Sequence, residues 1–318
     1  MRILKQILGI LATGYILFFY SELMFWARIR PDDSLQGWVG TWLLYSLMAY
    51  IFLIILARFQ VFTIWALFLA GAVFGWLTEG LIVQTAYESL PLSISFTGLA
   101  WHALISVWVG WYAVRRALHS GLRSILLWGA GIGLAYGFWA ISWWLEPDGG
   151  MATPFDFAKY AFSSSLLLIP AYWIHDRTVP GVFKPNQVVE IVIAILLLVY
   201  FTLVTIPAAP ISAVILPVLL AGIYLTLRQN QGTETRGSLL DSAVGVKDPW
   251  HYLALLILPL TASVFYWVAF SLGFRWHTNW LIYLVSMPAG FILLVVSLVK
   301  VWRRKPSLGG CVESADME

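Results

Sequence analysis

Residues 75–102 read GWLTEGLIVQTAYESLPLSISFTGLAWH and place two carboxylates and an imidazole in an apolar stretch without Lys or Arg. Two apolar runs flank the polar centre at 83–92, which predicts two membrane-crossing helices joined by a short connection. A charged group inside hydrocarbon costs several kcal/mol unless it faces a polar interior. We therefore expect Glu79, Glu88 and His102 to mark a functional site within this helical hairpin.

The whole chain has the composition of a membrane protein. Of its 318 residues, 60% are hydrophobic and 11% are charged, whereas a soluble domain has about 25% charged residues. Runs of about 20 apolar residues, the length that crosses the hydrocarbon core, recur along the chain. These features predict an all-α, polytopic integral membrane protein of the cell membrane, surrounded by the lipid bilayer.

The apolar runs predict a bundle of about ten transmembrane helices. Short connections favour antiparallel neighbours, because backbone exposed to lipid must be hydrogen bonded within its own segment. The count falls to eight or nine if the short pair around residues 207–210 is not two full spans. The predicted helices are 5–26, 38–57, 61–82, 93–114, 124–145, 157–174, 188–206, 209–227, 250–272 and 278–301.

The same pattern predicts how the chain is divided. The start, MRILKQILGI, is too long an apolar run for a cleaved signal and lacks a small-residue cleavage site, so we expect an uncleaved first helix. Residues 1–227 are expected to form the first eight helices, with an outward-facing polar site. A polar cytoplasmic linker at 228–249 precedes the last two helices at 250–302, and a disordered cytoplasmic tail follows at 303–318.

Charge counts predict the orientation and the character of the outer face. Alternating sides of the ten helices hold 15 and 4 of the 19 Lys and Arg residues, so the positive-inside rule places both termini in the cytoplasm. Half of the 16 acidic residues fall on the outer side, which favours cations or polar neutral groups over anions. These outer acids are Glu22, Asp32, Asp33, Glu79, Glu88, Glu146, Asp148 and Asp156.

Acid–base or proton-relay roles are predicted for Glu79, Glu88 and His102. Imidazole titrates near neutrality, so a histidine beside carboxylates in the membrane is suited to relay protons. At 1.5 Å per residue, His102 lies near the membrane midplane and Glu79 only a few ångström deep. A direct bond between them requires staggered helices or a connection that dips back into the membrane. In the alternative interpretation, His102 only makes one interhelical hydrogen bond.

Substrate contacts are predicted from polar and aromatic groups near the outer side. Tryptophans there can stack on a sugar, a quaternary ammonium group or an isoprenoid, although an interfacial aromatic belt explains them equally. The predicted substrate-binding residues are Glu22, Tyr87, Trp101, Trp143, Trp144, Glu146, Arg275 and His277.

Several functional classes are disfavoured by what the sequence lacks. It contains no nucleotide-binding glycine motif, no HExxH and no G-x-S-x-G, so neither a metal nor another cofactor is expected. The single Cys311 provides no thiolate cluster or disulfide framework. The basic residues are spread over the loops, so no nucleic-acid partner is expected.

Three functional interpretations remain open. Ten spans in 318 residues with both ends inside resemble drug/metabolite-type carriers in size and topology, which favours a transporter of a small polar or amphipathic solute, coupled to protons. The alternative is an intramembrane enzyme that acts on a lipid or isoprenoid from the outer leaflet, with Glu and His as acid and base. The third is an accessory scaffold. Substrate, coupling ion and oligomeric state are left open.

Overall fold

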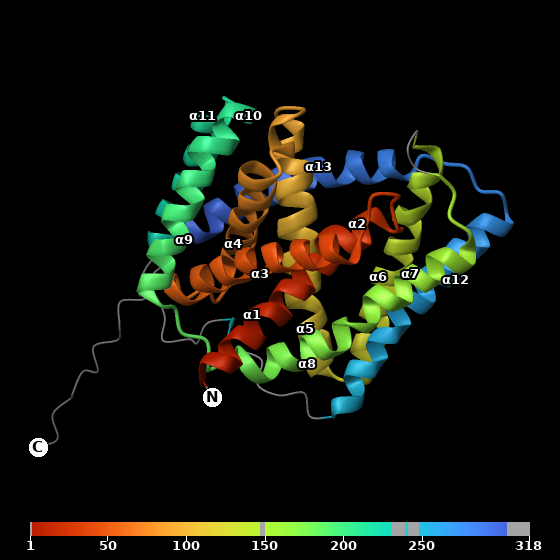
Figure 1. The fold of residues 1–318 in the computed structure, drawn as a ribbon. Coiled ribbons are helices and arrows are strands. Elements are labelled where there is room, and N and C mark those ends of the chain that lie inside the picture. The colour runs from red at the N-terminus through yellow and green to blue at the C-terminus, as the bar shows by residue number, and fades with distance from the viewer. Residues whose placement is uncertain (1, 147–149, 230–238, 241–247, 304–318) are drawn as a thin grey trace, which may run out of the picture.

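The computed structural model describes residues 2–146, 150–229, 239–240 and 248–303, and in these ranges the chain is helical without strands (Figure 1). We use η for π-helical and 3₁₀ segments. In chain order the elements are α1 (Arg2–Phe18), η1 (Phe19–Leu23), α2 (Met24–Trp26), α3 (Leu35–Arg58), α4 (Ile64–Trp76), η2 (Leu77–Ile82), η3 (Thr85–Tyr87), η4 (Ile94–Ala113), α5 (Val114–Ser120), α6 (Leu122–Ala140), η5 (Ile141–Leu145), α7 (Pro154–Leu166), α8 (Leu168–Thr178), α9 (Gln187–Tyr200), η6 (Phe201–Thr205), α10 (Ile206–Ala208), α11 (Ser212–Gln229), η7 (Pro249–Leu256), α12 (Ile257–Ser271) and α13 (Thr278–Trp302).

The all-helical prediction is confirmed, and nine continuous helices of the described ranges are long and apolar enough to cross a membrane, which is consistent with a multi-pass protein. The predicted tenth span at 157–174 is formed by α7 and α8, which are interrupted at Leu167. Neither part alone has the length of a span. The nine are Arg2–Trp26, Leu35–Arg58, Ile64–Ile82, Ile94–Ser120, Leu122–Leu145, Gln187–Ala208, Ser212–Gln229, Pro249–Ser271 and Thr278–Trp302.

The domain division remains a prediction. Most of the predicted linker, at 230–238 and 241–247, and residues 304–318 of the predicted tail lie outside the described residues. The described linker residue Leu239 donates its backbone N–H to the Val61 carbonyl at 2.8 Å, and Leu240 is buried. The linker is therefore attached to the bundle at this point.

Polar residues at the helix starts account for several element boundaries. Ser34 accepts a hydrogen bond from the Gly37 amide at the start of α3, and Thr63 accepts one from the Ala66 amide at the start of α4. Asn186 caps α9 in the same way. Such side chains satisfy backbone N–H groups that have no partner within the helix, so each cap sets where its helix begins.

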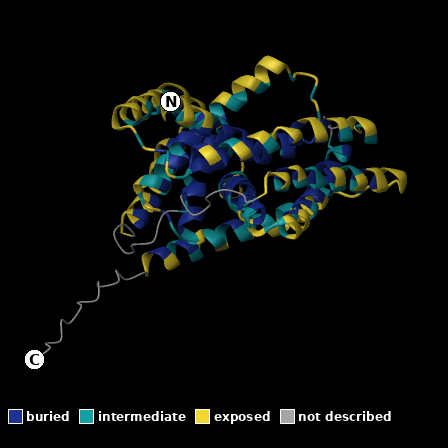
Figure 2. Ribbon diagram, turned by 90° about the horizontal axis from the view of Figure 1, so that it is seen from below, coloured by how far each residue is buried: buried dark blue, intermediate teal, exposed yellow. Residues whose placement is uncertain are grey.

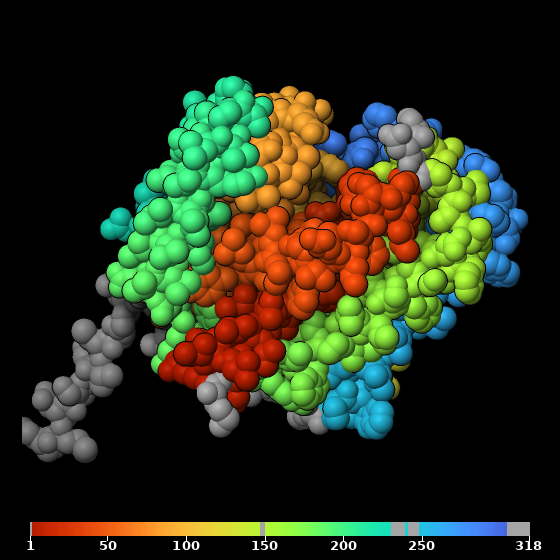
Figure 3. Space-filling model, viewed as in Figure 1, coloured from red at the N-terminus to blue at the C-terminus, as the bar shows by residue number. Residues whose placement is uncertain are grey.

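Burial separates central helices from peripheral ones. In the most apolar window of Ile64–Ile82, 83% of residues are buried, against 6% in Gln187–Ala208. Figure 2 shows buried residues concentrated within the bundle and exposed ones along its outer helices. In the space-filling view, the red and orange N-terminal helices lie between green α9 and yellow-green α7–α8 (Figure 3). The exposed apolar side chains of the outer helices are suited to face lipid.

Close packing of α4 against η4 positions the polar hairpin. A Cβ added at Gly75 would overlap the carbonyl oxygen of Gly98, and one added at Gly98 would overlap the indole of Trp76. Small residues at such crossings let helix backbones approach each other closely. This approach brings Glu79, four residues after Gly75, next to His102, four residues after Gly98.

Candidate functional site

A cavity of about 630 Å³ lies between η1, α2, the hairpin, η5 and α13. Its polar wall includes Ser21, Glu22, Glu79, Glu88 and His102. Four other hollows, of about 390 to 510 Å³, contain no acidic side chain. The acidic groups of the predicted site are therefore gathered on one cavity. The aromatic side chains of its wall are Phe25, Trp26, Phe96, Trp101, Trp143, Trp280 and Tyr283.

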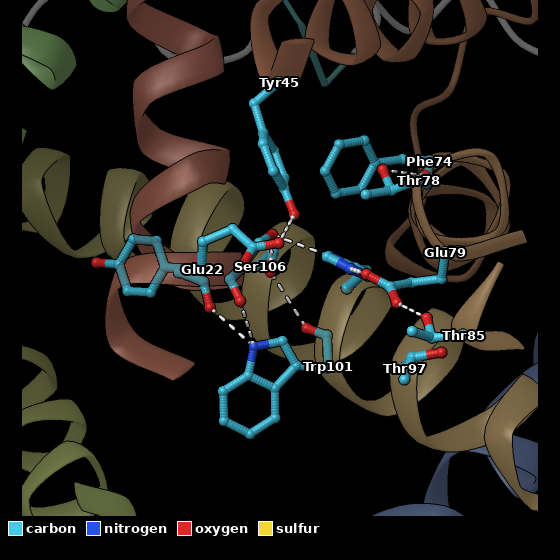
Figure 4. Close-up of polar contacts among 12 residues, drawn as sticks. Glu22, Tyr45, Phe74, Thr78, Glu79, Thr85, Thr97, Trp101 and Ser106 are labelled. Atoms are coloured by element: carbon cyan, nitrogen blue, oxygen red, sulfur yellow. Dashed lines mark hydrogen bonds and ion pairs between the residues drawn. The ribbon is translucent and has the colours of Figure 1, made fainter. Parts of the chain in front are cut away.

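Glu79 and His102 are in direct contact. The imidazole Nε2 lies 2.7 Å from Glu79 Oε1, and both side chains are buried. The other carboxylate oxygen accepts a hydrogen bond from the Thr85 hydroxyl. Thr85 belongs to the connection between the two helices, so this connection bends back to the site (Figure 4). Such a bend is one of the two arrangements that the sequence allowed for a direct contact between Glu79 and His102.

The second imidazole nitrogen begins a chain of hydroxyl groups. His102 Nδ1 lies 2.9 Å from Ser21 Oγ, which lies 2.8 Å from Ser106 Oγ. Ser106 in turn donates to the Trp101 carbonyl at 3.2 Å. Each hydroxyl can rotate its hydrogen to suit either neighbour, so the chain accommodates His102 with or without a proton on Nδ1.

Glu22 lies on the same cavity with different partners. Its carboxylate accepts a hydrogen bond from the Tyr45 hydroxyl at 2.7 Å (Figure 4) and another from the Trp26 indole N–H at 3.0 Å. In the described part of the chain, ion pairs form at Asp33, Glu79, Asp176 and Glu190 but not at Glu22. Both donors to Glu22 are neutral. Arg30 interacts electrostatically with this half-buried carboxylate but forms its ion pair with Asp33 instead.

The segments that carry these groups share an unusual backbone. Ser21 and Glu22 belong to η1, Glu79 to η2 and His102 to η4, and all three segments are π-helical. The wider π-turn is rare and frequently occurs at functional sites, because it alters the direction of side chains and the pairing of carbonyl groups. The backbone therefore supports the interpretation of this region as a site.

Three further predicted residues also line the cavity. Glu88 is exposed, Trp101 donates its indole N–H to the Tyr20 carbonyl at 3.1 Å, and Trp143 stacks on Trp26 with 5.1 Å between ring centroids. Trp101 and Trp143 are thus held in fixed orientations on the wall.

Five predicted residues do not line the cavity. Trp144 points to Tyr266 and donates to its hydroxyl at 2.6 Å, while Glu146 accepts a hydrogen bond from Asn279 at 2.7 Å. Arg275 and His277 are exposed. Tyr87 lies beside η2, and burial raises its pKa to about 12, so the hydroxyl stays protonated at neutral pH. Alternation along a helix or loop separates these residues from their neighbours on the wall.

The sequence interpretation missed several wall and partner residues. Ser21 and Tyr45 are ordinary in type and became recognisable only by what they contact. It also assigned little of the site to the second half of the chain, whereas Trp280 and Tyr283 of α13 line the cavity. Spacing of three residues places both rings on one face of α13, but only the tertiary structure shows which helix that face meets.

A second polar cluster lies near the opposite end of η4. Arg115 Nε donates to Asp176 Oδ1 at 3.0 Å, and Tyr252 donates to Asp176 Oδ2 at 2.8 Å. His119 Nε2 lies 3.4 Å from the same oxygen. Arg115 and Asp176 are buried; the sequence interpretation assigned both to the cytoplasmic side and gave neither a partner. Their pairing makes burial possible and connects η4–α5 with α8 and η7.

No protein-family model, curated protein or solved structure matches this chain. Function must therefore be argued from the cavity and its side chains.

Proposed function

We propose that this protein is a membrane carrier that couples movement of a small amphipathic solute to movement of protons. The observation that carries the proposal is the buried Glu79–His102 pair on the wall of the 630 Å³ cavity. Ionisable groups inside a membrane protein are rare and commonly mark ion or proton pathways.

The pair is built to gain and lose one proton. With a proton on Nε2 only, neutral His102 donates to the Glu79 carboxylate and the pair has a net charge of −1. A proton added at Nδ1 gives an imidazolium–carboxylate pair with no net charge. Ser21 donates to Nδ1 in the first state and accepts from it in the second, when Ser21 donates to Ser106. Both states are hydrogen bonded, so neither leaves a buried polar group without a partner.

The cavity wall is suited to an amphipathic solute. Its volume lies within the range of small-molecule sites, which combine apolar walls with a few polar groups. Here Phe96, Trp101 and Tyr283 supply apolar surface, while Glu22 and Glu79 supply polar anchors. We place the protein in the cell membrane with both termini in the cytoplasm, on the strength of its basic-residue asymmetry.

The experiment is solute-dependent proton flux in liposomes that contain the purified protein and an internal pH indicator. A panel of small amphipathic solutes is expected to include one that changes the internal pH. Glu79→Gln and His102→Gln are expected to abolish this change, since neither retains the exchangeable pair. Glu190→Gln, which removes a carboxylate on α9 outside the cavity, serves as the matched control. Unchanged flux in both cavity variants would contradict the proposal.

A specific observation also favours an enzyme as the second candidate. Ser21, His102 and Glu79 form a hydroxyl–imidazole–carboxylate chain of the kind that activates a serine nucleophile. Such an enzyme would cleave an ester of a lipid. We rank it second because the Ser21 side chain is buried between His102 and Ser106, which leaves little room for a substrate carbonyl.

A fluorophosphonate probe separates the two candidates. Covalent labelling of the purified protein that disappears in Ser21→Ala would favour the enzyme. An unlabelled protein with solute-dependent proton flux would exclude a reactive serine and support the carrier. If neither labelling nor flux is observed, both candidates are wrong and the polar groups serve assembly.

A further inference from the structure

The charge of the cavity wall is negative in every protonation state of the pair. Among the residues that the structure describes, three carboxylates line it, and the one basic side chain on the wall is His102, which already contacts Glu79. Two arginines lie nearby without lining the cavity: Arg30 is paired with Asp33 at 2.8 Å, and Arg28 lies over Trp143, with 5.2 Å between Cζ and the ring centroid. An anionic solute would be repelled here, and a cation attracted.

Glu22 is placed to be the counter-ion of that cation. Its carboxylate is half-buried beside aromatic rings and is held by two neutral donors, Tyr45 and Trp26. A carboxylate removed from water without a positive partner is costly. A bound cation next to Glu22 would remove that cost, whereas a neutral solute would leave it in place.

The aromatic wall favours a cation that needs no hydrogen-bond acceptors. Phe25 and Trp101 pack edge to face at 4.9 Å between centroids, and Phe96 and Tyr283 at 4.5 Å. Ring faces attract cations within about 6 Å, and groups of rings are a known way to hold quaternary ammonium ions. The structure already contains two such contacts at the edge of the site, where Arg30 Cζ lies 4.2 Å from the Trp26 ring centroid and Arg28 Cζ lies 5.2 Å from that of Trp143.

We propose that the solute is a monovalent organic cation of the quaternary ammonium class, held by Glu22 and the aromatic wall, and exchanged for a proton on the Glu79–His102 pair. This inference rests on the proposed carrier function and names its substrate class. The charge of the pair changes from −1 to 0 when it takes up a proton, so cation and proton compete for the same cavity. By linkage, each lowers the affinity of the other.

The other titratable groups around the pair do not oppose this competition between cation and proton. Glu22 and Glu88 face the same cavity, Tyr45 lies beside Glu22, and Tyr283 belongs to α13. Protonation of either carboxylate would also weaken cation binding. The affinity for a cation is therefore expected to fall as the pH is lowered.

Choline and its uncharged carbon analogue 3,3-dimethylbutan-1-ol are the probes, because they differ in charge and hardly in shape. Binding of each to the purified protein in detergent is measured calorimetrically at about pH 7.5 and about pH 5.5, which changes the proton concentration about a hundredfold. At the higher pH, choline is expected to bind at least about tenfold more tightly than the alcohol. At the lower pH, its affinity is expected to fall by about tenfold.

Two variants assign the roles of the carboxylates. Glu22→Gln is expected to weaken choline binding by about tenfold or more at both pH values, with little effect on the alcohol. Glu79→Gln is expected to bind choline at both pH values no more tightly than the acidic wild type, because without the carboxylate the pair has no negative charge. Glu190→Gln is the matched control and should bind like the wild type. Melting temperatures in the same detergent show whether each variant is folded.

The outcomes separate this inference from the carrier proposal. Equal affinity for choline and the alcohol, or binding of neither, overturns the cation assignment. Proton flux driven by a neutral solute would then leave the carrier function standing. Charge-selective choline binding without any proton flux in liposomes would support the cation site and contradict the carrier.

Discussion

His102 Nε2 and Glu79 Oε1 lie 2.7 Å apart, although the two residues are separated by 23 positions and belong to different helices. The contact depends on the close approach of α4 and η4 at Gly75 and Gly98. The polar chemistry of this protein therefore depends on a packing feature one helical turn away from each polar group.

Gly75→Ala tests that dependence. The added methyl group would overlap the backbone of Gly98, which cannot rotate away as a side chain could. We expect destabilisation of about 1–3 kcal/mol, typical of an overpacked contact, measured as a lower melting temperature in detergent. Gly131→Ala is the control, since no atom lies within 4 Å of its added Cβ. Equal melting temperatures of the two variants would show that the helices do not approach as described.

Asp176→Ala tests the second polar cluster. The substitution leaves the buried Arg115 without its carboxylate, and we expect a loss of about 3–5 kcal/mol in the free energy of unfolding. Glu190→Ala removes the carboxylate of the more exposed Arg58–Glu190 pair, for which about 0–1 kcal/mol is expected. Denaturation of both variants in the same detergent gives the comparison. Similar losses would argue that Asp176 is not buried in the folded protein.

Asp33 provides a pH dependence of stability outside the membrane-crossing helices. Burial acts to raise the pKa of its carboxyl, but hydrogen bonds from the side chain and backbone of Arg30 outweigh burial and lower the pKa below its usual value. A lowered pKa in the folded state stabilises the protein above the unfolded pKa of about 3.9, and this stabilisation is lost as the pH falls through the folded pKa. Asp33→Asn is therefore expected to lower the melting temperature at about pH 7 but not once the pH has fallen below the folded-state pKa of the wild-type carboxyl.

The neighbouring Asp32 is the control for this prediction. It is exposed, so Asp32→Asn is expected to leave the melting temperature unchanged at either pH. A constant difference between Asp33→Asn and the wild type at all pH values would mean that the effect does not come from the charge of Asp33.

Ser21→Ala tests the hydroxyl chain. His102 Nδ1 loses its partner in both protonation states, and the charged state loses the stronger of the two hydrogen bonds, by about 1 kcal/mol. We expect solute-dependent proton flux to fall by about five- to tenfold without being abolished. Ser46→Ala is the control, because this buried hydroxyl donates only to the Trp42 carbonyl of its own helix. Complete loss of function in Ser21→Ala together with fluorophosphonate labelling of the wild type would favour the enzyme.

Orientation is open to a direct test. A green fluorescent protein fused after residue 318 is expected to fluoresce, because it folds in the cytoplasm, while a periplasmic alkaline phosphatase fused at the same place is expected to be inactive. Fusions placed in the connection between α12 and α13 should give the opposite result. The same result from both sites would contradict the predicted topology.

The helical bundle was predictable because membrane insertion restricts the backbone. Each span must satisfy its own N–H and C=O groups, so apolar length alone indicates nearly every helix. The structure differs from the prediction of one continuous helix at 157–174, because α7 and α8 are separated by a break at Leu167. Apolar length reports the presence of helix but not a break within it, which depends on local packing.

The residues gathered on the cavity were also partly predictable. Glu22, Glu79 and His102 could be singled out because a charged or titratable group in hydrocarbon is rare and costly. Trp144 and Glu146 were selected with Trp143 because all lie in one short segment, yet only Trp143 lines the cavity. Proximity in sequence does not determine which side of a turn faces a cavity.

By itself, the sequence determined the class of protein and the short set of ionisable groups, because both follow from the free energy of placing side chains in hydrocarbon. Only the tertiary structure decided that Glu79 bonds to His102, that Ser21 and Thr85 complete their hydrogen bonds, and that α13 closes the cavity with Trp280 and Tyr283. These relationships depend on how helix faces pack against one another. Helix packing in a membrane is set by close steric fit between small residues such as Gly75 and Gly98. The pattern of hydrophobicity along the chain does not predict this fit.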